Sequence, residues 1–283
     1  MHSAHPMPVI PAERSDDLHH YEHRKDSDLV LFMAGNQFML ADELVNTFRQ
    51  QHPDVLRIFY ETLPPGLELK QILAEGALYR DDTIDLIPDV YMSVSERAMQ
   101  QLAEAGRIEP HGYRLYLHNR LSLMLPSGNP AGVRSIEDLG RTDVRISQPD
   151  PENEDIAFHI MDMYRDAGGD DLVRTIMEAK RQAGTTRMTV VHHRETPARI
   201  VGGEADAGPV WATEIRHARN TGLPVESLDP GPELDQRDKI NYFICRLKKA
   251  PNPANADKFL AFMQTDAARE IYRRHGFIPH DVR

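Results

Sequence analysis

The chain has 283 residues, of which 40% are hydrophobic and 27% are charged, which is the composition of a globular protein large enough for two domains. Its net charge is -11 and it has no long basic run. Nucleic-acid binding needs clustered Lys and Arg side chains, so this class of partner is excluded. No run of eighteen apolar residues occurs, so the sequence predicts no membrane-spanning helix.

A single cysteine, Cys245, excludes an intramolecular disulfide and a multi-cysteine metal site. Cys245 lies in the apolar stretch 241–246, where a buried strand residue that behaves as a small hydrophobe is expected.

The first 28 residues differ from the rest in being rich in proline, charge and histidine, and a disordered leader is expected over 1–28. Binding of a transition metal by its five histidines is the alternative. The sequence contains no apolar signal core, so it describes either a cytoplasmic protein or one whose secretory signal is absent from this sequence. The motifs described below favour the second.

Strands and helices alternate along the remainder, as in a parallel sheet with helices on both faces. Short apolar runs predict strands, and amphipathic stretches between them predict helices. The expected strands are 29–34, 55–60, 89–93, 120–125, 144–147, 189–191, 205–211 and 242–247. The longer expected helices are 40–49, 67–73, 96–105, 153–167, 171–182, 212–219, 255–263 and 266–275.

Several motifs occur in the order typical of one family. They are FMAGNQ at 32–37, DVYMSV at 89–94, NRLSLMLPSGNP at 119–130, GEADAGPVW at 203–211 and the helical pair at 250–277. With them the chain resembles the extracellular solute-binding proteins of ABC importers, and especially the molybdate-binding-protein branch. The resemblance covers nearly all of residues 29–283.

This resemblance implies the α/β two-lobed type II periplasmic-binding-protein fold. Each lobe would be a mixed, mostly parallel sheet flanked by helices, and two crossing strands near 117–121 and 225–228 would act as hinges. Lobe one would comprise 29–118 with 226–283, and lobe two 119–225. The implied protein is a periplasmic monomer without enzymatic activity or cofactor, which closes on a small-molecule or ion ligand and delivers it to ABC transporter membrane subunits.

Positions carried over from the family, together with nearby polar and aromatic side chains, give the ligand-binding candidates. They are Gly35, Asn36, Gln37, Thr62, Pro65, Gly66, Tyr91, Asn153, Glu154, Asp155, His193, Arg194 and Trp211. The chain departs from the branch at several of them: Asn36 and the Pro65–Gly66 pair stand where the branch has serines, and Trp211 stands where it has a tyrosine.

An acidic cluster at 152–155 replaces the branch's Pro-Ala-Gly at the start of a helix in lobe two. Its carboxylates either cap the helix or contact the ligand, and the residues leave both alternatives open. In the second case they would repel an oxyanion such as molybdate, and the cargo would be cationic, carry an amine or hydroxyls, or be a metal ion.

The stretch 191–196 offers His193 and Arg194, which can hold an anion or a carboxylate. Alternatively, His193 and Glu154 are candidate ligands for a transition metal, and a solvated role is the simpler alternative for each histidine. Alanine at Trp211 or Arg194 is expected to lower ligand affinity without unfolding the protein.

Two other functions remain open. A sensor with the same fold would also close on a ligand but would signal to a regulator. A metal-dependent enzyme built on the acidic cluster and His193 is the less favoured alternative, because the sequence contains no nucleophile elbow, phosphate loop, dinucleotide fingerprint or HExxH motif.

Overall fold

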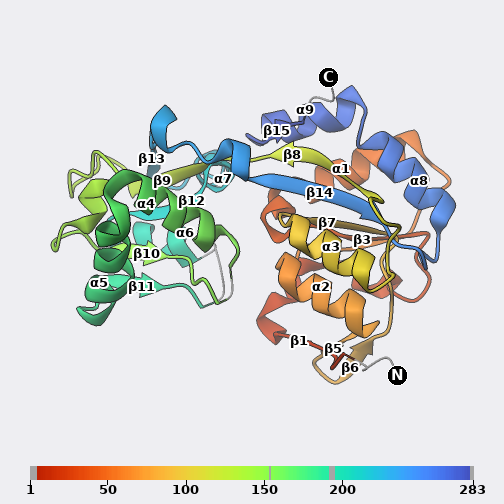
Figure 1. Ribbon diagram of the computed structural model, residues 1–283. Helices are drawn as coiled ribbons and strands as arrows, with labels where there is room; N and C mark the ends of the chain where they lie inside the picture. The colour runs from red at the N-terminus through yellow and green to blue at the C-terminus, as the bar shows by residue number, and fades with distance from the viewer. Residues whose placement is uncertain (1–4, 153, 191–194, 281–283) are drawn as a thin grey trace. The chain divides into compact units, whose positions relative to one another are not determined.

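The computed structural model describes residues 5–152, 154–190 and 195–280. The chain divides into two compact units (Figure 1). The first unit consists of Met1–Leu117, Asn241–Arg274 and Ile278–Arg283, and the second of His118–Ile240 and His275–Phe277. Among the described residues, no helix is long and apolar enough to cross a membrane.

The first unit is built on a mixed seven-stranded sheet. In spatial order its strands are β15 (Ile278–Pro279), β8 (Tyr113–His118), β14 (Asn241–Arg246), β7 (Val90–Ser93), β3 (Leu29–Phe32), β4 (Ile58–Glu61) and β2 (Leu18–His19). Strand β3 is parallel to both β4 and β7, whereas β14 is antiparallel to β7 and β2 is antiparallel to β4.

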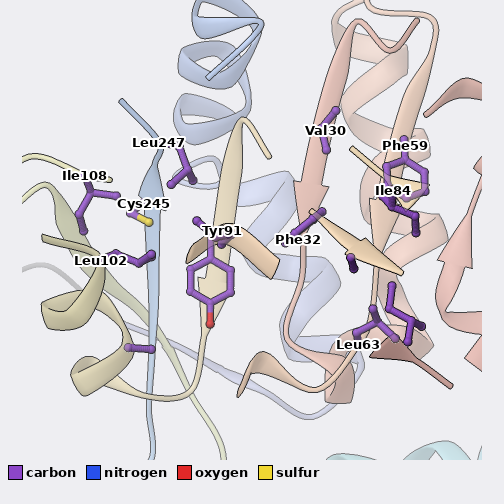
Figure 2. Packing of buried hydrophobic residues seen from close by; sticks show 14 of the residues in the cluster. Val30, Phe32, Phe59, Leu63, Ile84, Tyr91, Leu102, Ile108, Cys245 and Leu247 are labelled. Carbon is purple, nitrogen blue, oxygen red and sulfur yellow. The ribbon is translucent and has the colours of Figure 1, made fainter. Parts of the chain in front are cut away.

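Helices cover both faces of this sheet, because its strands are apolar on both sides. The helices are α1 (Phe38–Gln51), α2 (Pro65–Ala74), α3 (Glu96–Glu104), α8 (Pro253–Phe262) and α9 (Asp266–Arg274). Phe32 of β3 and Tyr91 of β7 pack in one cluster with Leu102 of α3 (Figure 2). On the other face, Phe48 of α1 contacts Phe259 of α8, with ring centroids 5.2 Å apart.

Cys245 is buried in the same cluster as Phe32 and Tyr91, as the sequence predicts (Figure 2). Burial raises the pKa of its thiol to about 12, so the reactive thiolate is suppressed at neutral pH. Cys245 therefore acts as a core residue.

The connections of the parallel strands place a switch point in the first unit. From β3 the chain passes through α1 to β4 on one side, and it later returns to β7 on the other side of β3. In open α/β sheets, ligands bind outside the carboxyl ends of strands where the order reverses in this way. The turns after β3, β4 and β7 are therefore the places to look for a site.

The leader is more regular than the sequence predicts. Strand β1 (Val9–Ile10) pairs with the hairpin of β5 (Ala77–Tyr79) and β6 (Asp82–Ile84). A 3-10 turn at Ala12–Asp17 then leads into β2 on the edge of β4. The prediction of a disordered leader over 1–28 is therefore wrong for residues 9–28. Strand β2 is ordered because it forms backbone hydrogen bonds with the open edge of β4.

The second unit contains two small sheets. Strands β12 (Gly208–Trp211), β9 (Leu121–Pro126) and β13 (Val225–Leu228) form an antiparallel sheet, and β10 (Ile146–Gln148) is parallel to β11 (Thr186–Met188). The helices are α4 (Ile156–Arg174), α5 (Lys180–Gln182), α6 (Glu195–Val201) and α7 (Ala212–Asn220). Met124, Ile200, Val210, Ile215 and Val225 belong to its core.

Two boundaries differ from the expected ones. Helix α4 runs on to Arg174, with non-helical backbone at Gly168 and Gly169 where the sequence predicts a gap between two helices. The return to the first unit comes at Asn241 and not near 225–228. Strand β13 stays in the second unit because it pairs along its whole length with β9.

Candidate functional site

The turn after β3 contains Gly35, Asn36 and Gln37, all of them buried. The Asn36 amide donates to the hydroxyl of Tyr242, but its Oδ1 is buried and has no hydrogen-bond partner among the described residues. A buried amide oxygen of this kind is costly unless it accepts a hydrogen bond. Asn36 is therefore the member of this turn best placed to accept one from a ligand.

Gln37 has a structural role instead. Its Nε2 donates to the hydroxyl of Tyr116 at 2.7 Å, and its Oε1 accepts from the hydroxyl of Tyr272 at 2.7 Å. Both polar atoms of the side chain are thus engaged inside the first unit.

The turn after β4 lies against the turn after β3. A Cβ atom added at Gly35 would meet the carbonyl oxygens of Thr62 and Leu63 at 3.0 Å each, so only glycine fits there without a shift. The structure therefore brings the candidates Gly35 and Thr62 together. The Thr62 side chain, however, turns to the N-terminal segment: its hydroxyl is 3.0 Å from Nε2 of His19.

The candidates Pro65, Gly66 and Tyr91 meet at the start of α2. Pro65 occupies the first turn of the helix, where a missing N–H costs nothing. The Tyr91 hydroxyl donates to the Pro65 carbonyl at 2.8 Å, which ties β7 to this turn. Gly66 is exposed, and a Cβ added to it would meet no atom within 4 Å.

In the second unit, two buried carboxyl groups come close together at the starts of α4 and α7. Glu154 is 9% exposed and accepts a hydrogen bond from the Thr189 hydroxyl. Glu214, in the first turn of α7, is 4% exposed, and burial together with the charge of Glu154 raises its pKa well above the usual range. Two carboxyl groups in one buried setting disfavour each other's ionisation.

The capping alternative for the acidic cluster fails at Asp155. This residue precedes α4 and is exposed, and its side chain makes no capping hydrogen bond within the described part of the chain. Glu154 Oε1 accepts a hydrogen bond from the Thr189 hydroxyl. The residues just before α4 thus include an exposed carboxylate, Asp155, beside a buried one, Glu154.

Trp211 lies where β12 passes into α7 and is 5% exposed. Its ring centroid is 6.3 Å from that of His159 in α4. Burial lowers the pKa of His159, which keeps this imidazole neutral at physiological pH. Trp211 therefore contacts α4, which Glu154 precedes, from the start of α7, which carries Glu214.

A buried arginine, Arg199 of α6, organises the segment beside these carboxyl groups. Its guanidinium donates to the hydroxyl of Ser147 at 3.1 Å and to the carbonyls of Arg187 and Met188 at 3.2 and 3.1 Å, and it pairs with Glu195. Ser147 Oγ in turn is 2.8 Å from the Thr196 hydroxyl. Arg199 thereby joins β10, β11 and α6.

Three candidates, Asn153, His193 and Arg194, lie outside the described residues. The proposed pairing of His193 with Glu154 as metal ligands falls there too. Among the residues that the structure does describe, no group of three or more His, Cys, Asp or Glu side chains is arranged to hold a metal ion. This includes the described histidines of the N-terminal segment.

Residues 29–278 match the sequence profile of bacterial extracellular solute-binding proteins. The chain belongs to this family. A molybdate-binding protein ModA of Mycobacterium tuberculosis is 25% identical over 251 residues, which are 88% of this chain and 84% of the relative. The family and these relatives are binding proteins and not enzymes.

Solved structures of binding proteins share the fold of this solute-binding protein. The sulfate-binding protein SubI of Mycobacterium tuberculosis aligns with a TM-score of 0.70 and 16% identity, over 89% of this chain and 86% of SubI. A periplasmic molybdate-binding protein of Azotobacter vinelandii aligns with a TM-score of 0.69 and 19% identity, over 89% of this chain and 100% of the other. The predicted α/β fold class and family resemblance are thus confirmed, but the sheets are mixed and not mostly parallel.

The sequence alone does not indicate three of the residues described above, Glu214, Arg199 and Thr189. Glu214 and Arg199 read as ordinary charged residues of surface helices, and Thr189 as part of a strand. The pattern EIRHA at 214–218 does carry one signal, because Glu214 shares a helical face with the apolar Ala218. For Arg199 the sequence offers no comparable sign.

Proposed function

We propose that this chain is the periplasmic solute-binding component of an ABC importer, and that it closes as a monomer around a small polar solute that carries hydrogen-bond donors, such as an amine. Family membership supports the transport role. The observation that carries the choice of solute is the pair of buried carboxyl groups, Glu154 and Glu214, at the starts of α4 and α7.

Helix starts ordinarily attract anions, because their N–H groups are unpaired and carry partial positive charge. Here carboxyl groups stand at both starts, and Asp155 adds an exposed negative charge. An anionic solute about 4 Å from one carboxylate would be repelled by about 4 kcal/mol at an effective dielectric constant of about 20. A doubly charged oxyanion is disfavoured next to this pair, and a cation is favoured.

The first unit supports the same choice. Asn36 Oδ1 is a buried acceptor that lacks a partner among the described residues, at the carboxyl end of β3. A solute with N–H or O–H groups satisfies it, whereas an oxyanion has only acceptors to offer.

A second candidate cargo is an oxyanion such as molybdate or sulfate. It is favoured by the identity to the molybdate-binding ModA over most of the chain. In that case Glu154 and Glu214 would serve only the packing of α4 and α7.

Isothermal calorimetry with putrescine, L-arginine, molybdate and sulfate separates the two cargoes. We expect binding of putrescine or L-arginine, and about a tenfold or greater loss of that affinity in Glu154→Gln, because one charge-assisted contact is lost. Glu178→Gln, an exposed change in the second unit, is the matched control.

Binding of molybdate or sulfate alone, unchanged in Glu154→Gln, would overturn the cationic cargo and leave the oxyanion as the answer. Trp211→Ala is expected to weaken either cargo without unfolding the protein, since the tryptophan lies between α4 and α7.

A further inference from the structure

The N-terminal segment precedes the part of the chain that matches the family, which begins at residue 29. Strand β2 of this segment adds to the sheet edge, with Leu18 opposite Glu61 and His19 opposite Tyr60. The contact is made by side chains as well as backbone, because the His19 ring stacks on the Tyr60 ring with centroids 4.4 Å apart and planes 6° apart.

The backbone N–H and the side-chain hydroxyl of Thr62, which follows β4, both form hydrogen bonds with this N-terminal segment. The Thr62 N–H donates to the Asp17 carbonyl at 2.9 Å, and the Thr62 hydroxyl is hydrogen-bonded to His19 Nε2 at 3.0 Å. These are the two groups through which a threonine in a ligand turn would contact a solute. Thr62 therefore serves the position of its turn and not the solute.

The segment itself is fixed at this point. Asp17 is 2% exposed, and its carboxylate pairs with Arg14 at 3.3 Å. A buried ion pair with these contacts holds the backbone carbonyl of Asp17 in place, which is the acceptor for Thr62.

The turn after β4 packs against the turn after β3 and restricts its position. The carbonyl oxygens of Thr62 and Leu63 lie 3.0 Å from the position that a Cβ of Gly35 would take, and Asn36 follows Gly35. A displacement of Thr62 would therefore also shift the turn after β3, in which the buried Asn36 Oδ1 has no hydrogen-bond partner among the described residues.

We propose that residues 12–23 act as a clamp that positions the turns after β4 and β3, with His19 as its positioning residue. The clamp rests on the proposed function only in that these turns are taken to contact the solute. The hydrogen bond from His19 to Thr62, and not the bulk of the imidazole ring, is what sets the turn.

Amide hydrogen exchange at Thr62, measured by NMR on the full chain without any added solute, tests the clamp. His19→Phe keeps a ring to stack on Tyr60 but loses the hydrogen bond, whereas His19→Gln keeps a side-chain hydrogen-bonding group but loses the ring. We expect exchange at Thr62 to be about tenfold faster in His19→Phe and within about twofold of wild type in His19→Gln.

The matched control is His5→Ala, which removes an exposed histidine from the same leader and is expected to leave exchange at Thr62 unchanged. Thermal melts of all variants establish that they are folded. If His19→Phe does not fold, His19→Gln still tests the clamp. Slow exchange in His19→Phe with fast exchange in His19→Gln would overturn the role of the hydrogen bond in favour of ring packing. Wild-type exchange in both would overturn the clamp. Because no solute is present, neither result depends on the identity of the cargo.

Discussion

Arg199→Ala is expected to lower the free energy of unfolding by about 3 kcal/mol, as the loss of one member of a buried charged network does. The substitution removes the donor for the carbonyls of Arg187 and Met188 and for the Ser147 hydroxyl. It also removes the ion pair that Arg199 makes with Glu195 within α6. These acceptors lie in a partly buried region, so water replaces the arginine poorly.

Urea unfolding followed by circular dichroism measures this effect. Arg181→Ala, which removes an exposed arginine from α5 in the same unit, is the matched control and is expected to change stability by less than about 0.5 kcal/mol. Arg199→Lys keeps the charge but has one nitrogen in place of a fork, so an intermediate loss is expected. A loss below about 1 kcal/mol in Arg199→Ala would show that the network is dispensable.

The fold could be predicted because its signals are local and repeated. The strand at 29–32 is apolar on both faces, and it is followed by a helix with one apolar face, so a doubly covered sheet is the arrangement that buries both. The order of motifs then fixed the family. The break at Gly168 and Gly169 is also predictable, because glycine is a poor helix former. Gly169 takes a φ of 68°, which other residues rarely adopt.

The candidate site could be predicted only in outline. The family resemblance points to the turns at Gly35, Thr62 and Pro65, but which atoms face a solute depends on partners far along the chain. His19 lies 43 residues before Thr62, and its solvated appearance in a charged leader conceals the contact. Arg199 contacts Ser147, which lies 52 residues earlier in the chain, and no helical or strand period indicates such a contact.

The leader was misjudged for a related reason. Proline, charge and histidine are typical of disordered segments, and they describe the exposed side of residues 9–28 correctly. The composition does not reveal that an open edge at β4 is available to pair with Leu18 and His19. Edge pairing is a property of the receiving sheet, so the segment alone cannot predict it.

Stability is expected to fall as pH rises between about pH 5 and 8, and Glu61→Gln should remove much of this dependence. Glu61 ends β4 and is fully buried, where burial raises its pKa to about 8 despite two hydrogen bonds of 2.9 Å from the Gln71 amide. The neighbouring Glu68 is buried as well, and its pKa is raised by burial and by Glu61.

The sign follows from proton binding. The folded protein holds the Glu61 proton up to about pH 8, whereas the unfolded chain releases it near the ordinary value of 4.5. Unfolding therefore releases a proton in this window, and each pH unit costs up to about 1.4 kcal/mol of folding free energy. The stabilisation is complete below the unfolded pKa and is lost as pH rises through the folded one.

Urea unfolding at pH 5, 6.5 and 8 measures the slope. The glutamine of Glu61→Gln has the shape of the protonated acid and remains neutral, so the variant should be more stable than wild type at pH 8 by several kcal/mol and similar at pH 5. Glu104→Gln, an exposed change in α3, should keep the wild-type slope. Glu68, Glu214 and Asp89 contribute to the slope left in Glu61→Gln, because their raised pKa values act in the same direction. If Glu61→Gln and wild type share one slope, Glu61 is ionised in the folded protein. The edge of β4 would then have to accommodate a buried charge beside Glu68, which the single hydrogen-bonding amide of Gln71 is poorly suited to stabilise.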